Sequence, residues 1–539
     1  MAKNISILVL LALVVGLPFL FRNKETGIPP GTASVVIVSP HNESIRHEFG
    51  RGFREWYREK SGQDVYVDWR VLGGTSEIVR YIQGEYTAAF RSHWVNDLGL
   101  RWNTEVMLNF ANRRLVLDDT PDDDTEAERA RRAFLGSEVS CGIDVFFGGG
   151  TYDHNWQAQV GNTIANRLMQ THPDWFGKSG IPRLSSGEPY WDSEGRWLGA
   201  VLSSYGMIYN LDSLDRLGLA AAPEHWWDLQ NPKLFGEVAV CDPTKSGSIT
   251  QAFEMIIQQQ IQIELSRLQS EEALVEDLEA EAVRKGWESG LRLIRRISGN
   301  ARYFTDSSMK PSIDVSLGQA AVGMTIDFYG KFQVESVETR TQKQRLGFVT
   351  PKGGTTISAD PISLLRGAPD RKLAEAFIEF VMSTDGQKLW CFKANEKVEG
   401  APQRFSLRRT AIRPDLYTPE FTPLMSDPDY QPYERASEFY YHADWTSPLF
   451  NEIRFLIKVM CLDLHPELKT AWKALIDSDF PKEATLVFDD LSTLSYDVVV
   501  EKYAPIIGSG DPEAEVALAR ELGSLFREQY QSVERMANR

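Results

Sequence analysis

The feature that most constrains the fold is a regular alternation of short apolar runs with longer stretches of helical periodicity. The apolar runs, which we expect to be buried strands, cover 35–39, 64–70, 143–147, 206–210, 237–241, 321–326, 346–350 and 362–365. The intervening helical patterns cover 43–60, 76–83, 249–269, 271–298 and 371–383. Alternation of this kind predicts an α/β protein with largely parallel sheets covered by helices on both faces.

The first strand ends on a run of polar residues, SPHNES, at 39–44. In open α/β sheets ligands bind beyond the carboxyl ends of the strands, so this turn is a candidate binding site. The other reading is local, because Asn42 and its neighbours could simply cap the helix that follows. Features elsewhere in the chain are needed to decide between ligand binding and helix capping.

Three further loops after strands carry glycine with Ser or Thr just before a helix. They are LGGTSEIVRYI at 72–82, DVFFGGGTYD at 144–153 and CDPTKSGSITQAF at 241–253. A helix start offers unpaired N–H groups and a partial positive charge, which suit an anion or a polar oxygen. Ser or Thr in that position is usually only a cap, but four such loops in one chain favour a shared cleft. The candidate ligand contacts in these loops are Ser39, His41, Asn42, Gly74, Thr75, Gly149, Thr244, Ser246, Gly247 and Ser248.

A fifth candidate lies in GQAAVGMTIDFYGKF at 318–332, where an apolar strand leads to Asp327 and Tyr329. A carboxylate and a phenol at the end of a buried strand could hold sugar hydroxyls, an amine or a metal. The local alternative is that Asp327 caps the next helix.

Charge and cysteine content restrict the class of function. A formal net charge of −17 argues against general nucleic-acid binding, although a single small anion needs only local donors. The four cysteines are widely spread without a CxxC pair, so they do not indicate a zinc site. A bridge between Cys391 and Cys461 is possible but does not follow from the sequence.

The sequence carries no recognisable catalytic signature. GxSxG, HExxH, P-loop and dinucleotide-binding patterns are absent, and the eight histidines are scattered. We therefore expect a protein that is not an enzyme and that has no catalytic cofactor; the alternative is an extracytoplasmic enzyme that uses His41 or Asp327 as a general base.

The amino terminus predicts export. An apolar run at 5–21 follows one lysine and precedes Arg22 and Lys24, a pattern typical of a signal peptide or a short membrane anchor. No small-x-small cleavage site follows, which favours an anchor, with a Pro/Gly-containing linker at 22–34. The body is then expected outside the cytoplasmic membrane, in the periplasm, with a possible tether to the inner membrane.

With these loops in place, the chain resembles the periplasmic solute-binding proteins of ABC importers, in the branch that binds ferric iron, phosphosugars, phosphonates or thiamine. The resemblance is carried by VVIVSPHNESIRHEF, GGTSEIVRYI, IDVFFGG, YGMIYNLDSLDRLGLAAAPEHWWDL, GEVAVCDPTKSGSI, DSSMKPSIDVSLGQAAVGMTIDFYG and LGFVTPKGGTTISADPISLLRGAPDRKLAEAFIEFVMSTDGQKLW. These pieces occur in the order of the family, from residue 35 to about residue 414.

The resemblance implies two α/β lobes joined by hinge strands, closing over one ligand that is delivered to a membrane permease. It suggests a leader and linker at 1–33, the first part of lobe 1 at 34–150, lobe 2 at 151–340 and a return to lobe 1 with the hinge at 341–431. Two segments read as additions, a solvated insertion at 85–135 and a mostly helical extension at 432–539. The extension could pack on the body or dock a partner, as in a sensor or an assembly component.

Ligand identity is where the chain departs from the ferric binders. Those proteins use a histidine from the first loop, an acid after the third strand and two adjacent tyrosines. His41 and Tyr329 match the histidine and the second tyrosine, so they are the metal ligands if ferric iron is bound. Phe328 replaces the first tyrosine and Gly149 stands where the acid would fall, which leaves a poor set for a hard ferric ion. A small anionic or phosphorylated organic ligand is therefore preferred, with the TKSGS loop holding the anion and Asn42 and Asp327 contacting hydroxyls or an amine.

Overall fold

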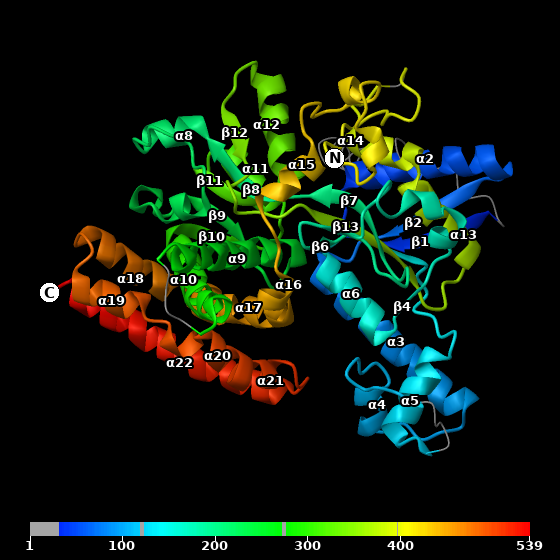
Figure 1. Cartoon of the computed structure of the whole chain (residues 1–539), viewed down its shortest axis with the longest axis horizontal. Coiled ribbons are helices and arrows are strands. Elements are labelled where there is room, and N and C mark those ends of the chain that lie inside the picture. Colours follow the sequence, from blue (N-terminus) through cyan, green and yellow to red (C-terminus); the bar gives the residue numbers. More distant parts are fainter. Residues whose placement is uncertain (1–31, 119–122, 272–275, 396) are drawn as a thin grey trace, which may run out of the picture.

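The chain folds into two α/β lobes, each built on its own sheet, with helical additions on both (Figure 1). The structure, a computed structural model, describes residues 32–118, 123–271, 276–395 and 397–539. Residues 1–31 of the predicted leader and linker at 1–33 lie outside these residues. Within the part of the chain described, no helix is both long and apolar enough to cross a membrane.

Lobe 1 contains the first sheet, in the order β2-β1-β3-β13-β4, with β7 also paired to β13. Strands β1, β2 and β3 are parallel, whereas β13 runs antiparallel to β3, β4 and β7. Its strands are β1 (Ala33–Val38), β2 (Val65–Arg70), β3 (Val145–Phe147), β4 (Thr163–Ile164), β7 (Leu198–Ser203) and β13 (Ser358–Leu365). Its helices are α2 (Glu43–Ser61), α3 (Thr75–Ser92), α6 (Thr151–Val160), α7 (Leu168–Thr171), α13 (Arg371–Met382) and α14 (Thr384–Cys391), and a small hairpin is formed by β5 (Leu184–Ser185) and β6 (Glu188–Pro189).

Lobe 2 contains the second sheet, in the order β10-β9-β11-β8-β12. The first three strands are parallel, and β8 runs antiparallel to β11 and β12. The strands are β8 (Tyr205–Asn210), β9 (Val238–Cys241), β10 (Ala301–Thr305), β11 (Val322–Ile326) and β12 (Leu346–Val349). The helices are α8 (Leu211–Arg216), α9 (Gly247–Ser270), α10 (Leu278–Asn300), α11 (Lys310–Ser316) and α12 (Asp327–Thr341).

Before the C-terminal extension, the two sheets are joined by crossings from β7 to β8 and from β12 to β13. The first crossing lies at Ser204, because β7 ends at Ser203 in the first sheet and β8 begins at Tyr205 in the second. The expected start of lobe 2 at residue 151 is therefore too early, since β4 and β7 still pair with β13. The expected return at 341 also precedes β12, which belongs to the second sheet.

All eight predicted strands are present, whereas several other strands and helices were not predicted. Helix α3 continues to Ser92 instead of ending at 83, since Ile78, Ile82, Tyr86 and Phe90 keep one apolar face at four-residue spacing. Strands β4, β7 and β10 and helix α12 were not predicted as elements. The four cysteines are buried and free, so the possible bridge between Cys391 and Cys461 is not formed.

The predicted insertion carries helices, as expected, but it is not only a solvent-exposed segment. Helices α4 (Thr104–Asn109) and α5 (Glu126–Leu135) bury Phe110 and Phe134 against Phe90 and Trp94. This cluster continues to Phe146 of β3, so the insertion shares a core with lobe 1.

The predicted helical extension packs on lobe 2 and also reaches lobe 1 (Figure 1). Its helices are α15 (Pro432–Arg435), α16 (Ala443–Thr446), α17 (Phe450–Ile457), α18 (His465–Asp477), α19 (Lys482–Asp489), α20 (Tyr496–Val498), α21 (Ala504–Ile507) and α22 (Pro512–Ala537). On lobe 2, Gln258 of α9 donates to the Thr446 hydroxyl at 2.7 Å. On lobe 1, the Tyr441 N–H donates to the Ser186 carbonyl at 2.8 Å, and Phe450 stacks on Tyr152 of α6 with ring centroids 4.3 Å apart. One segment, 441–450, thus contacts both lobes.

Candidate functional site

A cavity of about 240 Å³ lies between the two lobes, where strand ends and helix starts from both sheets meet. A volume of this order suits a small ligand. Lobe 1 lines it with Pro40, His41, Gly73, Gly74, Thr75 and Gly149, and β13 and the chain beyond it with Asp360 and Arg409. Lobe 2 contributes Lys245, Ser246, Ser248, Asp306, Ser307, Ser308, Ile326, Phe328 and Tyr329.

The lobes touch beside this cavity. A Cβ atom built on Gly74 would lie 2.4 Å from the carbonyl oxygen of Lys245, so only a residue without a side chain permits this approach. The Lys245 ammonium also lies 3.3 Å from the Glu77 carboxylate, which makes an ion pair between the lobes. The two lobes therefore touch each other beside the cavity, as in a closed arrangement of the lobes.

Three helices begin at the cavity wall. Helix α3 starts beside Gly74 and Thr75, helix α9 beside Ser246 and Ser248, and helix α12 beside Phe328 and Tyr329. The N–H groups of a first helical turn have no acceptor within their own helix, and the helix dipole adds partial positive charge there. Helix starts from both lobes converging on one cavity suit an anionic group.

Arg409 is the buried cation of the site, at 3 % exposure. Its Nη2 donates to the Ser203 hydroxyl and to the Asp360 carboxylate, and the guanidinium lies 4.1 Å from the centroid of the Phe328 ring. Its Nε and Nη1 are buried and donate to no acceptor among the described residues. A buried guanidinium with two unused donors is well suited to bind an oxyanion.

His41 faces the same cavity as a neutral imidazole. Burial, with Arg409 and Arg46 nearby, holds the pKa of His41 well below its usual value. Neither ring nitrogen has a hydrogen-bond partner among the described residues. The ring is held edge-on against Phe147, with centroids 4.6 Å apart, and Gly148 leaves room for it, since a Cβ there would lie 2.6 Å from the ring. A neutral imidazole can donate one hydrogen bond and accept another from a ligand.

The donor set is unfavourable for ferric iron. Burial raises the pKa of Tyr329 to about 12, so losing the phenol proton to a metal would cost more than for an exposed tyrosine. Asp360 is already engaged by Arg409. Among residues 32–118, 123–271, 276–395 and 397–539, no group of three His, Cys, Asp or Glu side chains is placed to hold a metal ion. The residues present favour an anion over a hard cation.

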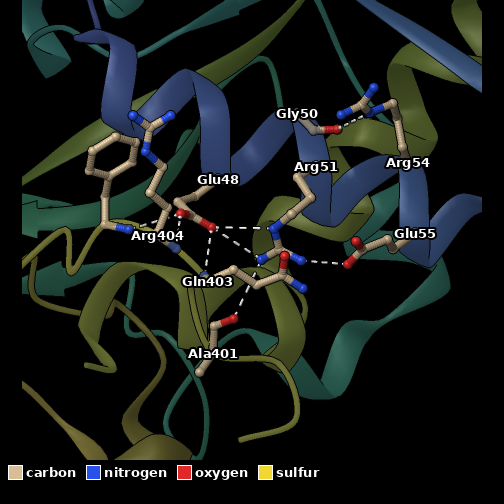
Figure 2. Close-up of polar contacts among 9 residues, drawn as sticks. Glu48, Gly50, Arg51, Arg54, Glu55, Ala401, Gln403 and Arg404 are labelled. Carbon is tan, nitrogen blue, oxygen red and sulfur yellow. Dashed lines mark hydrogen bonds and ion pairs between the residues drawn. The ribbon is translucent and has the colours of Figure 1, made fainter. Parts of the chain in front are cut away.

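The loop that leads to Arg409 is fixed by a buried carboxylate on α2 (Figure 2). Glu48 accepts hydrogen bonds from the backbone N–H groups of Gln403 at 3.0 Å, Arg404 at 2.8 Å and Phe405 at 3.0 Å, and from Arg51 at 3.1 Å. Burial tends to raise the pKa of Glu48, but these donors outweigh it and hold the pKa below its usual value. Glu48 thus positions the segment four residues before Arg409.

We expect Glu48→Gln to lower the free energy of unfolding by about 3 kcal/mol near neutral pH, because a neutral amide cannot accept all four hydrogen bonds. The lowered pKa means that the ionised carboxylate stabilises the fold above its unfolded-state pKa and that this stabilisation is lost as pH falls through the folded-state pKa. The difference between wild type and variant should therefore shrink below about pH 4, as measured by urea unfolding across pH.

Glu55→Gln is the matched control, since Glu55 lies on the same helix and pairs with the same Arg51 but is exposed. It should cost no more than about 0.5 kcal/mol. A Glu48→Gln effect as small as that of the control would contradict the anchoring role.

Seven of the sequence-predicted site residues line the cavity: His41, Gly74, Thr75, Gly149, Ser246, Ser248 and Tyr329. Ser39, Asn42, Thr244, Gly247 and Asp327 do not. Asn42 caps α2 by accepting from the Ile45 N–H at 3.1 Å. Asp327 accepts from the Phe328 N–H at 2.7 Å and from the Ser204 hydroxyl at 3.2 Å, so it fixes the first interlobe crossing.

Of the remaining three, Ser39 and Thr244 have local roles, whereas Gly247 lies at a contact between the lobes. Ser39 accepts from the His41 N–H at 3.1 Å, and the Thr244 N–H donates to Asp242 at 2.7 Å within its turn. Gly247 is packed against Asp153, since a Cβ there would lie 2.4 Å from its carboxylate. The expected contacts of Asn42 and Asp327 with ligand hydroxyls are thus not supported by their positions.

Sequence reasoning missed Arg409, Asp360, Ser307 and Ser308, and it included Lys245 only as part of the TKSGS loop. Ser307 and Ser308 stand in DSSMKPS and Asp360 in SADPIS, both inside the stretches that carried the family resemblance. The pair Arg408–Arg409 was a visible signal, although nothing local says which of the two turns inward.

Comparison with known proteins finds a family model that is similar to the middle of the chain. Residues 140–402 match the family model described as bacterial extracellular solute-binding protein. A curated relative, an uncharacterized protein from Haemophilus influenzae, is 25 % identical over 248 residues, which cover 46 % of this chain and 60 % of the relative. The chain thus spans about 60 % of the length of that relative.

Solved structures of periplasmic binding proteins align at low identity. The binding protein AfuA from Actinobacillus pleuropneumoniae, with fructose-6-phosphate bound, is 16 % identical with a TM-score of 0.47, covering 80 % of this chain and 99 % of that one. The apo ferric ion-binding protein A from Pasteurella haemolytica is 11 % identical with a TM-score of 0.44, covering 86 % of this chain and 100 % of that one.

Proposed function

Because residues 140–402 match the bacterial extracellular solute-binding proteins, we propose that this protein captures a small anionic, phosphate-bearing organic ligand in its interlobe cavity. The family is one of binding proteins, so reversible capture is the activity and no bond is made or broken. The ligand stabilises the closed arrangement of the lobes by contacting both of them.

The observation that carries this proposal is the buried Arg409, with two unused donor nitrogens, in a cavity onto which three helix starts converge. An oxyanion seated there would accept from Arg409 and from first-turn N–H groups of α3 and α9, which belong to opposite lobes. His41 supplies one more neutral donor from lobe 1. The remaining walls, Phe328 and Ile326, suit the carbon skeleton of an organic ligand.

We further propose that the protein works outside the cytoplasmic membrane and delivers its ligand to an ABC permease. The extracellular character of the family supports the location. The closed contact between Gly74 and Lys245 supports delivery by lobe closure, since the surface offered to a permease changes when the lobes separate.

The test is a thermal-unfolding screen of the purified protein with fructose 6-phosphate, a phosphonate, thiamine phosphate and ferric citrate, each beside its phosphate-free or iron-free counterpart. A ligand at 100 times its Kd stabilises the folded state by about 2.7 kcal/mol, which is easily measured. We expect at least one phosphorylated compound to raise the midpoint, while its dephosphorylated counterpart does not.

The same screen tests the ferric alternative. Stabilisation by ferric citrate alone, with the visible absorbance of an iron–phenolate bond that is lost in Tyr329→Phe, would overturn the anion proposal in favour of iron. No response to any phosphorylated compound would also overturn it.

A further inference from the structure

A second cavity, of about 230 Å³, lies where lobe 1, lobe 2 and the C-terminal extension meet. Its wall comes from α6, the β5–β6 hairpin and the chain up to Trp197 in lobe 1, from α9 in lobe 2 and from 441–450 of the extension. It shares no lining residue with the interlobe cavity. Nothing in the proposed capture of an anion uses it.

Two buried carboxyl groups form the polar part of its wall. Glu188 and Glu254 are each 1 % exposed and come from opposite lobes. One oxygen of Glu188 accepts from Gln251 at 3.0 Å, and one oxygen of Glu254 accepts from Tyr441 at 2.8 Å and Thr446 at 2.6 Å.

Neither carboxyl group has a cationic partner. Lys, Arg and His side chains in the described parts of the chain make no ion pair with either group, although Arg183 also lines the cavity, and a Thr356 hydroxyl lies close enough to Glu188 to lower its pKa somewhat. The other acid in the wall, Asp192, is already paired with Arg196 at 2.9 Å. Buried carboxylates without a partner are costly, so this pair is poised to accept a cation from outside the chain.

The rest of the wall is aromatic and includes an unused donor. Tyr152, Trp191, Trp197, Tyr441 and Phe450 line the cavity. Trp197 is 3 % exposed, and its indole N–H donates to no acceptor among the described residues. Aromatic faces attract ammonium groups, and a buried indole N–H favours a ligand that also carries an acceptor.

We propose that this second cavity binds a small organic cation, a protonated amine whose ammonium group is held by Glu188 and Glu254 against the aromatic wall. The Trp197 N–H donates a hydrogen bond to a hydroxyl or other acceptor on the same molecule. The site is distinct from the anion site in chemistry and in residues, and it is completed only when the extension covers both lobes.

The raised pKa values of the two carboxyl groups support this assignment. Burial raises the pKa of Glu188 to about 8, with Glu254 adding to the effect, and burial raises that of Glu254 to about 7. The titratable or charged groups that line the cavity are Tyr152 on α6, Arg183, Glu188 and Asp192 around the hairpin, Glu254 on α9 and Tyr441 on the extension. An ammonium group would favour the ionised carboxylates, so binding near pH 7 should release protons.

The experiment is isothermal titration calorimetry of the full chain with ethanolamine, choline, benzylamine and tyramine, beside benzyl alcohol as the neutral counterpart of benzylamine. We expect at least one amine to bind with a Kd below about 1 mM, whereas benzyl alcohol gives no heat of binding. Repeating the titration at pH 7 in buffers of different ionisation enthalpy should reveal the released protons.

Glu254→Gln and Glu188→Gln should each weaken amine binding by about 30-fold or more, because they remove a charge from a buried pair. Glutamine keeps the oxygen that accepts from Tyr441 and Thr446, so the fold is retained, which circular dichroism verifies. Glu264→Gln is the matched control. Glu264 lies on α9, like Glu254, but pairs with Arg267 at 2.9 Å, so this variant should bind the amine as wild type does.

Absence of amine binding up to about 5 mM would overturn the proposal, as would unchanged binding in both glutamine variants. Arg409→Gln should leave amine binding unchanged, because Arg409 lies in the other cavity. Loss of amine binding in that variant would show that the amine occupies the anion site and would likewise overturn the assignment.

Discussion

Arg409→Gln is expected to weaken binding of the phosphorylated ligand by about 100-fold, or ~3 kcal/mol, with little change in overall secondary structure. Two charge-assisted hydrogen bonds to an oxyanion would be lost, each contributing about 1.5–3 kcal/mol. The measurement is calorimetry with the compound that gives the largest stabilisation in the ligand screen.

The neighbouring arginine gives the control. Arg408 lies 3.2 Å from Glu335 and also pairs with Asp427, and it does not line the cavity, so Arg408→Gln should leave the affinity within about 3-fold of wild type. Removing Arg409 also leaves Asp360 buried without its cation, which is destabilising. The double variant Asp360→Asn/Arg409→Gln removes that charge, and wild-type affinity in it would contradict the assigned role of Arg409.

Gly74→Ala is expected to weaken ligand binding by about 30- to 100-fold while leaving each lobe folded. The added Cβ would lie 2.4 Å from the Lys245 carbonyl oxygen, far inside the ~3.5 Å of a comfortable contact, so the lobes must separate to accommodate it. Overpacking of this kind costs about 1–3 kcal/mol, and here the cost falls on the closed state alone. Calorimetry gives the affinity, and small-angle X-ray scattering should show a more open ligand-free protein.

Gly84→Ala is the matched control on the same helix. A Cβ there meets nothing within 4 Å, and alanine in a helix interior stabilises by up to about 1 kcal/mol over glycine. Gly74 itself has φ −76°, so alanine brings no backbone strain of its own. Equal affinities in both variants would show that closure at Gly74 is not required for binding.

The strands and the class of fold were predictable because buried strands have short runs of apolar residues that are easy to identify. Strand β11 is wholly buried, and in strand β1 the residues from Val35 onward are buried or half-buried, so their apolar sequences could be read directly. Strand β7 was missed although it is wholly buried, because it is followed after one residue by β8 and the two merge into a single apolar stretch in the sequence. The lobe boundary was misplaced for the same reason.

Part of the candidate site could be predicted from the sequence. Loops that join a strand to a helix have a local signature, so His41, Gly74, Thr75, Ser246 and Ser248 could be proposed from their neighbours alone. The same signature also marks plain capping, which is what Asn42 does. Periodicity cannot distinguish a cap that lines a cavity from one that does not.

Arg409 could not be predicted, because its partners are remote and its neighbour is identical. Its guanidinium meets Ser203 and Asp360, which lie 206 and 49 residues away in the chain. Arg408 has φ 53°, a left-handed backbone that separates the directions of the two side chains. Only the tertiary structure decides that Arg409 turns toward the cavity and Arg408 toward Glu335 and Asp427.

The segment 441–450 ties the two halves of the molecule together outside the hinge. If the lobes separate to release the proposed ligand, this segment has to give up contacts with one of them, such as the hydrogen bond from Tyr441 to Ser186 on lobe 1 or that from Gln258 to Thr446 on lobe 2. The residence time of that ligand would then depend on the extension as well as on the cavity. Under the proposed function, any change that weakens these contacts would therefore also speed ligand release.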